Sequence, residues 1–546
     1  MVADGQEPNT GEEPMPKNIV LCSDGTGNKG GSGSDTNVFK IYNAVRINDI
    51  PDNKRQQVVF YDNGVGTSKL GLLKALGGGL GLGFRQNVRD LYEFLGRHYT
   101  GSEDHVYIFG FSRGAATVRA FAGMVEYCGL VVKHPRDVDG GLDEEVFQDR
   151  IDAVMRHYAN RGGRWSIRKL LRSVQELFRQ TPAFERESTI KIEFMGIWDT
   201  VAALGAPQLP LFDHVLNFIR RHKFYDLEPA TCVRNVYHAM AVDDERRTFW
   251  PKVWNEATFK GGGTIEQVWF SGMHSNVGGG YPRDELANVT LDWMMERLNE
   301  HRDALSGSDP SGGLLLKPET KRDARADANP FGKVYDSRSG FNIFYRYQPR
   351  PIEDLCSVAK TLVRIHESVL DRLELRTAGY TPGNLPAKFH VAVTPAGPLS
   401  PADADASRVG SGARQDAESY SSFRARLDSF KNSRIGLYWT FLMSSLAVVA
   451  ASGVLWIRGA DRPPIDCCWP ELSTAQSWLV DILRYVLPTF FDGAITYLAI
   501  EHPVRFAILV SYAILLYCLR VSHQIEMEAL QGNARLVMLS AMGRRT

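Results

Sequence analysis

Ser112 is the residue of this chain whose surroundings best fit a nucleophile. It is the central residue of a Gly-x-Ser-x-Gly pentapeptide, Gly-Phe-Ser-Arg-Gly, at positions 110–114. A serine attacks a carbonyl carbon efficiently when it lies on a tight turn between a strand and a helix, close to backbone N–H groups that stabilise the oxyanion. The pentapeptide therefore predicts acyl transfer, on the condition that a strand precedes it and a helix follows it.

The flanking sequence meets both conditions. Residues Val106–Phe109 form an apolar, β-branched and aromatic run that is typical of a buried strand. Residues 115–125 have helical spacing and stop near Gly129, which suits a helix C-cap. Gly110 and Gly114 fit a turn that leaves no room for a Cβ atom. A bare pentapeptide is most often an ordinary Gly-Ser turn, but the strand, turn and helix together favour the nucleophile.

A serine nucleophile needs a base and an orienting acid, which α/β hydrolases supply in the chain order Ser, Asp or Glu, His. Asp199 follows the predicted strand Ile190–Ile197, at the end where catalytic groups of a parallel sheet emerge. His274 follows the predicted strand Val268–Phe270, on a loop beside three glycines. We therefore expect these two residues to complete the catalytic set with the serine.

Several other residues are alternatives for these roles. Asp284, Asp243 and Asp244 are fallback acids, since all three lie downstream of the serine. A surface or structural role is the default for any one of the 13 histidines. Chain order and a position at a strand end favour His274 over His238 and His366.

A glycine-rich segment, Cys-Ser-Asp-Gly-Thr-Gly-Asn at 22–28, follows the first predicted strand. It suits an oxyanion turn, in which the N–H of Arg113 is the first donor and the turn at Gly25 and Thr26 supplies the second. The segment also resembles a phosphatase-type Asp-x-Asp-Gly-Thr motif. Cys22 occupies the nucleophile position of that motif, so the phosphatase interpretation lacks its key residue.

The elements around these residues predict an α/β fold with a mostly parallel sheet and helices on both faces, as in α/β hydrolases. We expect a disordered tail at 1–17, a catalytic domain at 18–395 and a linker at 396–430. Insertions are expected around 130–188 and 205–230, where basic amphipathic segments are either a lid or membrane surface, or helices packed on the sheet. The predicted strands are Ile19–Cys22, Val58–Tyr61, Val106–Phe109, Ile190–Ile197 and Val268–Phe270.

Residues 431–546 differ sharply from the rest of the chain. Ile435–Ile457 is an uncharged run flanked by arginines and long enough to cross a bilayer. A shorter apolar run, Phe506–Leu519, also lies between two arginines. We therefore predict a helical, membrane-associated C-terminal region.

Composition excludes several classes of function. The 546 residues carry 63 basic and 63 acidic side chains, which gives no reason to expect nucleic-acid binding. The seven cysteines show no Cys-x-x-Cys or metal-ligand spacing. The glycine cluster at 77–83 lacks the features of a P-loop or a dinucleotide fingerprint, and we interpret it as a mobile loop. We expect no cofactor.

The first seventeen residues lack a signal-peptide pattern, so any export would use a leaderless route.

Beyond the serine motif, a series of segments between about residues 18 and 390 resembles one known family. The segments, in chain order, are SDGTGN, NV at 37–38, YDNGVGT at 61–67, GFSRGA at 110–115, GIWDTVAALG at 196–205, DDERR at 243–247, VWFSGMHSNVGGGYP at 268–282, IHESVLDR at 365–372 and YTPGNLP at 380–386. Together they are similar to the catalytic domain of the type VI secretion phospholipase effectors, a branch of the α/β-hydrolase superfamily.

The resemblance implies a Ser–Asp–His lipase that cleaves acyl esters of phospholipids, and it assigns these roles to Ser112, Asp199 and His274. It also implies a phospholipid membrane as partner, and secretion machinery and an immunity protein if the chain is an antibacterial effector. Two alternatives stay open: a resident membrane-associated esterase that acts on another acyl ester, and a non-catalytic membrane-anchored module that keeps only the hydrolase fold.

Overall fold

The computed structural model divides the chain into two compact units, residues 1–345 with 349–411 and residues 346–348 with 412–546. All elements below belong to the first unit. The residues described are 15–25, 30–31, 34–51, 54–63, 80–133, 142–160, 190–201, 229–307, 309, 311–338, 345, 347–375, 377–380, 382–386 and 388–394, with parts of 429–443 and 510–525.

The described strands form one eight-stranded sheet in the order β2-β1-β3-β4-β5-β6-β7-β8. Every neighbouring pair is parallel, so the α/β fold with a mostly parallel sheet is confirmed. The strands are β1 (Lys17–Ser23), β2 (Gln56–Asp62), β3 (His105–Phe111), β4 (Ile192–Trp198), β5 (Val233–Ala241), β6 (Ile265–Phe270), β7 (Arg364–His366) and β8 (His390–Ala392). Five of these were expected; β5, β7 and β8 were not.

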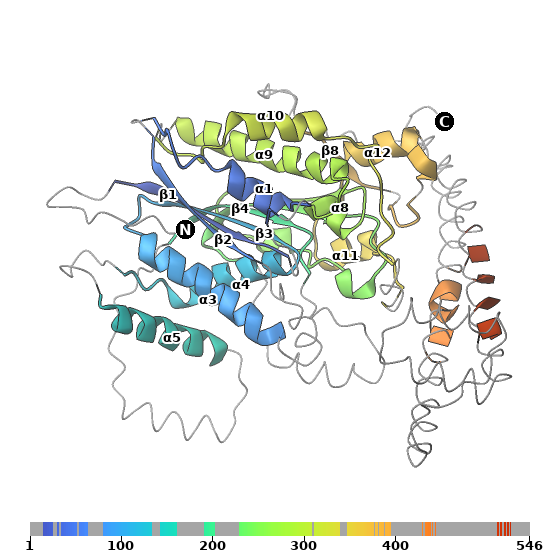
Figure 1. Cartoon of the computed structure of the whole chain (residues 1–546), viewed down its shortest axis with the longest axis horizontal. Coiled ribbons are helices and arrows are strands. Elements are labelled where there is room, and N and C mark those ends of the chain that lie inside the picture. Colours follow the sequence, from blue (N-terminus) through green and yellow to red (C-terminus); the bar gives the residue numbers. More distant parts are fainter. Residues whose placement is uncertain are drawn as a thin grey trace, which may run out of the picture. The chain divides into compact units, whose positions relative to one another are not determined.

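Helices cover both faces of the sheet, as predicted. Helices α3, α4 and α5 lie on one face, and α1, α9 and α10 lie on the other (Figure 1). The helices are α1 (Asn37–Ala44), α3 (Leu80–His98), α4 (Arg113–Cys128), α5 (Glu144–Asn160), α8 (His274–Gly278), α9 (Glu285–Ser306), α10 (Pro318–Asp327), α11 (Ile352–Val358) and α12 (Glu367–Glu374). Short 3₁₀ turns are η1 (Arg247–Phe249), η2 (Glu256–Thr258) and η4 (Thr377–Gly379).

The alternation of side chains along each strand explains why the central strands are apolar throughout. In β1, Ile19 and Leu21 belong to the core shared with α3, α4 and α5. Val20 and Cys22 belong to a second core on the opposite face, shared with α1 and α9. Successive side chains of a strand point to opposite faces, so a strand covered on both sides is hydrophobic at every position.

The strand order also marks a position for function. The chain runs outward from β1 in two directions, to β2 on one side and to β3 and the rest on the other. In sheets of this type, ligands bind in the crevice outside the carboxyl ends of the strands where the order reverses. The carboxyl ends of β1 and β3 carry the Cys22–Asn28 segment and the serine pentapeptide.

Two local predictions are wrong. Helix α3 begins at Leu80, so the second half of the 77–83 cluster is helical and not a loop; glycines are tolerated in a first helical turn that a long, well-packed helix continues. His274 is the first residue of the short helix α8, and not part of an open loop.

Other predictions concern residues that are not described. They include the basic segment at 166–178, the segment at 209–224, Thr26 and most of both C-terminal apolar runs. Within the described part of the chain, no helix combines the length and apolar character needed to cross a bilayer. The predicted domain boundaries, and the association of the C-terminal region with a membrane, stay predictions.

Candidate active site

Ser112 lies between the last residue of β3 and the first residue of α4, and its backbone is strained. Its φ of 59° and ψ of −118° fall outside the regions that L-residues ordinarily adopt. Two backbone hydrogen bonds, to the last residue of β4 and to the segment after it, hold this conformation: Ser112 N donates to Trp198 O at 3.0 Å, and Val201 N donates to Ser112 O at 3.2 Å. A strained serine that the surrounding structure holds in place is what a nucleophile elbow requires.

The two glycines of the pentapeptide are required by close packing. A Cβ atom on Gly110 would lie 2.7 Å from the Cα of Ala115. A Cβ atom on Gly114 would lie 2.0 Å from the carbonyl oxygen of Ser23, at the end of β1. These contacts bring the start of α4 against the carboxyl end of β1, and so place Ser23 and Asp24 close to the serine turn.

Asp199 directly follows β4, the strand next to β3. Phe111 pairs with Trp198 across the two strands, so Ser112 and Asp199 leave the sheet side by side. Asp199 also has a positive φ, 42°, and its N–H donates to Ala239 O at 2.7 Å. Its side chain is completely buried. The predicted position of this acid at a strand end is confirmed.

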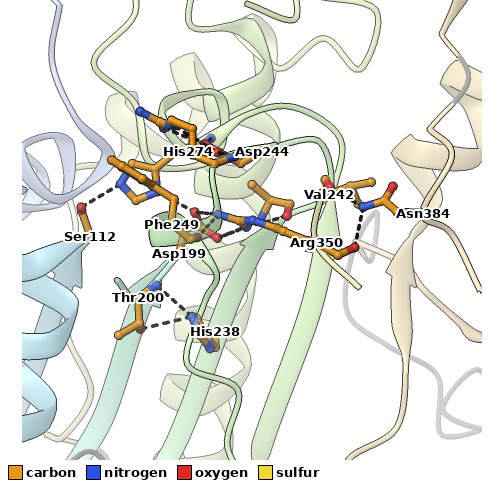
Figure 2. Close-up of polar contacts among 12 residues, drawn as sticks. Ser112, Asp199, Thr200, His238, Val242, Asp244, Phe249, His274, Arg350 and Asn384 are labelled. Atoms are coloured by element: carbon orange, nitrogen blue, oxygen red, sulfur yellow. Dashed lines mark hydrogen bonds and ion pairs between the residues drawn. The ribbon is translucent and has the colours of Figure 1, made fainter. Parts of the chain in front are cut away.

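His274 connects the two side chains, as Figure 2 shows. Its Nε2 lies 2.7 Å from Ser112 Oγ and its Nδ1 lies 2.5 Å from Asp199 Oδ2. The imidazole contacts two phenyl rings, with ring centroids 4.6 Å from Phe111 and 5.1 Å from Phe249. The structure therefore brings the three predicted residues together in one hydrogen-bonded chain that is shielded from water.

The charge states of these groups follow from burial and from their neighbours. Burial lowers the pKa of His274, although the hydrogen bond and the charge of Asp199 act in the opposite direction. Burial alone would raise the pKa of Asp199, but the charge and hydrogen bonds of Arg350, together with His274, hold it well below its usual range. At neutral pH the Asp199 carboxylate is therefore ionised and the His274 imidazole is neutral. The hydroxyl of Ser112 lies within hydrogen-bonding distance of this imidazole.

Arg350 is the residue at this site that the sequence did not reveal. Its side chain is fully buried and binds both carboxylate oxygens of Asp199, with Nη1–Oδ1 at 2.6 Å and Nη2–Oδ2 at 2.7 Å. The local sequence Gln-Pro-Arg-Pro carries no chemical signature, and this arginine is one of 63 basic residues. Its role depends on a contact with Asp199, 151 positions earlier in the chain, which the local sequence does not indicate.

The alternative acids and bases have other partners. Asp284 pairs with Lys40 at 2.5 Å, and Asp243 accepts hydrogen bonds from the Gly272 N–H and the Tyr380 hydroxyl. Asp244 binds Arg246 and accepts a long hydrogen bond, 3.3 Å, from the backbone N–H of His274.

The alternative histidines are both buried. His238 contacts Thr200, and burial lowers its pKa to about 3. His366 contacts Ser368 and Thr394.

The predicted oxyanion donors are only partly described. Arg113 is the first residue of α4, where helix N–H groups have no partner within the helix. The N–H of Gly25 donates to Asp24 Oδ1 at 2.6 Å, and the other carboxylate oxygen of Asp24 accepts from Thr36 and Tyr61. Burial raises the pKa of the Cys22 thiol, which does not favour a thiolate. In the part of the chain that is described, no group of three or more His, Cys, Asp or Glu side chains could hold a metal ion.

Residues 17–297 match the family of the type VI secretion system (T6SS) phospholipase effector Tle1-like catalytic domain. The matched segment contains residues 22–28, the serine pentapeptide, Asp199 and His274, and it ends before Arg350.

Among curated proteins, the chain is 28% identical over 246 residues to the uncharacterized protein YEL023C of Saccharomyces cerevisiae. That alignment covers 43% of this chain and 32% of the yeast protein, so the chain spans about a third of that relative's length.

Two solved structures have a partial likeness. One, described as the Tle1 effector bound to the VgrG spike from the type 6 secretion system, is 18% identical, with 51% of this chain and 54% of that chain covered and a TM-score of 0.29. The other, an uncharacterized protein from Pseudomonas aeruginosa, is 19% identical, with 58% and 49% covered and a TM-score of 0.30.

Proposed function

Because the chain belongs to the family of T6SS Tle1-like phospholipase effectors, we propose that it is a serine hydrolase that cleaves acyl esters of phospholipids, a phospholipase of the A type. The observation that carries the proposal is the buried relay from Ser112 Oγ through His274 to Asp199 Oδ2. Family membership supplies the substrate class, and the relay supplies a chemical route from the serine to an acyl ester.

In the first half of the reaction, His274 Nε2 accepts the proton of Ser112 Oγ as this oxygen attacks the ester carbonyl carbon. Asp199 stays ionised and stabilises the imidazolium that forms. The oxyanion of the tetrahedral intermediate accepts a hydrogen bond from the N–H of Arg113 at the start of α4. A second donor from the turn at Gly25 and Thr26 remains a prediction, and Gly25 would have to release Asp24 Oδ1 to serve.

In the second half, the intermediate expels the lysophospholipid alkoxide, which takes the proton from His274. The fatty acyl group is then bound to Ser112 as an ester. Water, deprotonated by His274, attacks this acyl-enzyme, and the fatty acid leaves as the serine hydroxyl is regenerated. No step needs a metal or an organic cofactor.

The decisive experiment measures fatty-acid release from defined phospholipids by the full chain and by Ser112→Ala. We expect Ser112→Ala to lose activity by on the order of 10⁶-fold, as removal of a triad serine does elsewhere. Ser102→Ala, at an exposed serine in the turn before β3, is the matched control and should retain full activity. Undiminished hydrolysis by Ser112→Ala would overturn the proposal.

A fluorophosphonate probe tests the serine independently of the lipid. A labelled Ser112 in a protein that ignores phospholipids but hydrolyses another acyl ester would indicate the resident esterase. A folded protein that is not labelled at all would indicate the non-catalytic module.

The family also supports a route of action. We propose that the protein is delivered by type VI secretion and acts at the membrane of the target cell, with its C-terminal region associated with that membrane. Under this proposal its partners are the secretion machinery and, in the producing cell, an immunity protein. Growth competition between a strain that carries the gene and a sensitive strain, with and without Ser112→Ala, tests this role.

A further inference from the structure

The guanidinium of Arg350 is built into the interior between three elements. Besides the two oxygens of Asp199, it donates to two backbone carbonyls: Nη1 to Ala241 O at the end of β5, and Nη2 to Phe249 O at the end of η1, both at 2.6 Å. Figure 2 shows the side chain extending from its own segment to the carboxylate. Its planar fork matches the two oxygens of a carboxylate, which an ammonium group does not.

The Arg350 backbone is fixed in turn. Its carbonyl oxygen accepts a hydrogen bond from Asn384 Nδ2 at 3.1 Å, and the same amide group donates to Val242 O at 2.8 Å. Prolines at 349 and 351 restrict the backbone on either side. The arginine therefore reaches Asp199 from a segment that is itself tied to the end of β5.

These contacts leave the carboxylate of Asp199 no freedom to rotate. Oδ1 accepts from Ala241 N at 3.0 Å and from Arg350, and Oδ2 accepts from His274 and from Arg350. Three of these four donors belong to Ala241 and Arg350, and they turn the carboxylate so that Oδ2 faces the fourth, His274 Nδ1. The proton of the neutral imidazole is thereby held on Nδ1, and Nε2 is left free to accept from the serine.

Arg350 also changes the charge that His274 experiences. The groups that face His274 are Asp199 after β4, Ser112 after β3, and the pair of Asp244 and Arg246 after β5. The opposite charges of Asp244 and Arg246 largely offset each other. Asp199 is similarly offset by Arg350, so the positive charge on a protonated His274 gains less from the carboxylate than it would in an isolated Asp–His pair.

We propose that Arg350 is a positioning residue for the reaction: its fork orients the Asp199 carboxylate toward His274 Nδ1 and offsets the charge of that carboxylate. This rests on the proposed function, since it concerns the same base. It differs from a purely structural role, in which Arg350 would only join the ends of β5 and η1.

The test is the pH dependence of Ser112 labelling by a fluorophosphonate, together with kcat/KM on a short-chain phosphatidylcholine. In Arg350→Met the acidic limb of both profiles should move to higher pH by ~1 unit or more, because a cation beside the pair is lost. The maximal rate should also fall, by less than the ~10⁴-fold that loss of a triad carboxylate causes.

Two further variants separate the roles of charge and geometry. Arg350→Lys keeps the charge but not the fork, so its acidic limb should stay near that of the wild type while its rate falls. Arg372→Met is the matched control, since Arg372 is also buried and bonds two carbonyls, Pro330 O and Gly332 O, away from the relay. The acidic limb of the pH profile of Arg372→Met should stay at the wild-type position.

The outcomes are distinct. A folded Arg350→Met protein with a wild-type limb, or an Arg350→Lys protein with the full wild-type rate, overturns the proposal. If Arg350→Met does not fold, the rate of Arg350→Lys still tests whether the two-pronged geometry of the guanidinium is needed. A wild-type protein that is neither labelled nor active refutes the serine mechanism itself. In that case, titration of His274 by ¹⁵N-histidine NMR in the wild type and Arg350→Met still reports the charge beside the imidazole: an equal pKa of His274 in both proteins overturns the proposal.

Discussion

Asp199 has two partners of different kinds, His274 and Arg350, and replacing it affects them in different ways. In Asp199→Asn, the imidazole loses the anion that fixes its tautomer, and we expect kcat to fall by ~10⁴-fold. The same change leaves the buried Arg350 without a counter-charge, which should lower the free energy of unfolding by about 3–5 kcal/mol. Kinetics and urea denaturation measure the two effects separately.

Asp284→Asn is the control for this prediction. Asp284 is partly exposed and pairs with Lys40 near the start of α9, so its loss should cost less than about 1 kcal/mol and leave kcat unchanged. If Asp284→Asn were the damaging change and Asp199→Asn the mild one, the assignment of the acid would be wrong.

At the scale of single residues, the sequence was most informative where type, order and position in an element agree. Ser112, Asp199 and His274 each follow an apolar strand, and their order along the chain is that of a known catalytic set. Arg350 satisfies none of these criteria: it lies beyond α9 and α10, on an irregular segment, and its role depends on tertiary packing alone.

At the scale of elements, the turn that carries Ser112 depends on a close contact between β1 and α4. Gly114→Ala would place a Cβ atom 2.0 Å from a backbone oxygen of Ser23, which cannot move without disturbing β1. We expect this variant to lose about 1–3 kcal/mol of stability through overpacking. Because Ser112 lies only two residues before Gly114, its labelling by a fluorophosphonate should also slow strongly.

Gly307→Ala is the matched glycine control, since a Cβ atom there meets nothing within 4 Å and its φ of −74° suits alanine. It should be neutral or stabilise by about 0.4–1 kcal/mol. Equal melting temperatures and labelling rates for Gly114→Ala and Gly307→Ala would contradict the close approach of β1 and α4.

The elements that the sequence did not reveal share physical reasons. Strand β5 contains Asn235 and His238, which break its apolar pattern; in the structure Asn235 bonds Glu193 O and His238 Nε2 bonds Thr200. Strands β7 and β8 have three residues each, too few for any periodicity. Short or polar strands are thus fixed by the sheet that surrounds them and not by their own composition.

For the molecule as a whole, buried histidines make stability depend on pH. His366 is buried against Phe270, and burial lowers its pKa from 6.5 to about 3. Between these two values the unfolded chain binds a proton that the folded chain does not, so stability is lost as pH falls. From pH 7 to pH 5 this group should remove about 2 kcal/mol from the free energy of unfolding.

Urea denaturation of the wild type and His366→Gln at the two pH values isolates this contribution. Glutamine can still bond the hydroxyls of Ser368 and Thr394 but does not titrate. Groups with the opposite tendency, such as Asp62, whose pKa burial raises to about 7, are present in both proteins and cancel in the difference. An identical loss of stability in both proteins would exclude His366 as the source.

The apolar C-terminal segments are separate in sequence from the elements that carry the site. The sheet, both cores and the relay all lie within residues 15–394. If residues 431–546 hold the site at a lipid surface, their effect is one of local concentration and not of chemistry. A chain that ends at residue 395 should therefore hydrolyse a monomeric short-chain phospholipid at the rate of the full chain.

On phospholipid vesicles the same truncated chain should be slower by ~10²-fold or more, because each encounter with the bilayer is then independent. Full-length Ser112→Ala is the control, and it should still sediment with the vesicles although it cannot cleave them. Equal vesicle hydrolysis by the full and truncated chains would show that the C-terminal region does not dock the enzyme. The preference for lipid would then have to reside in the acyl-binding surface around Ser112 itself.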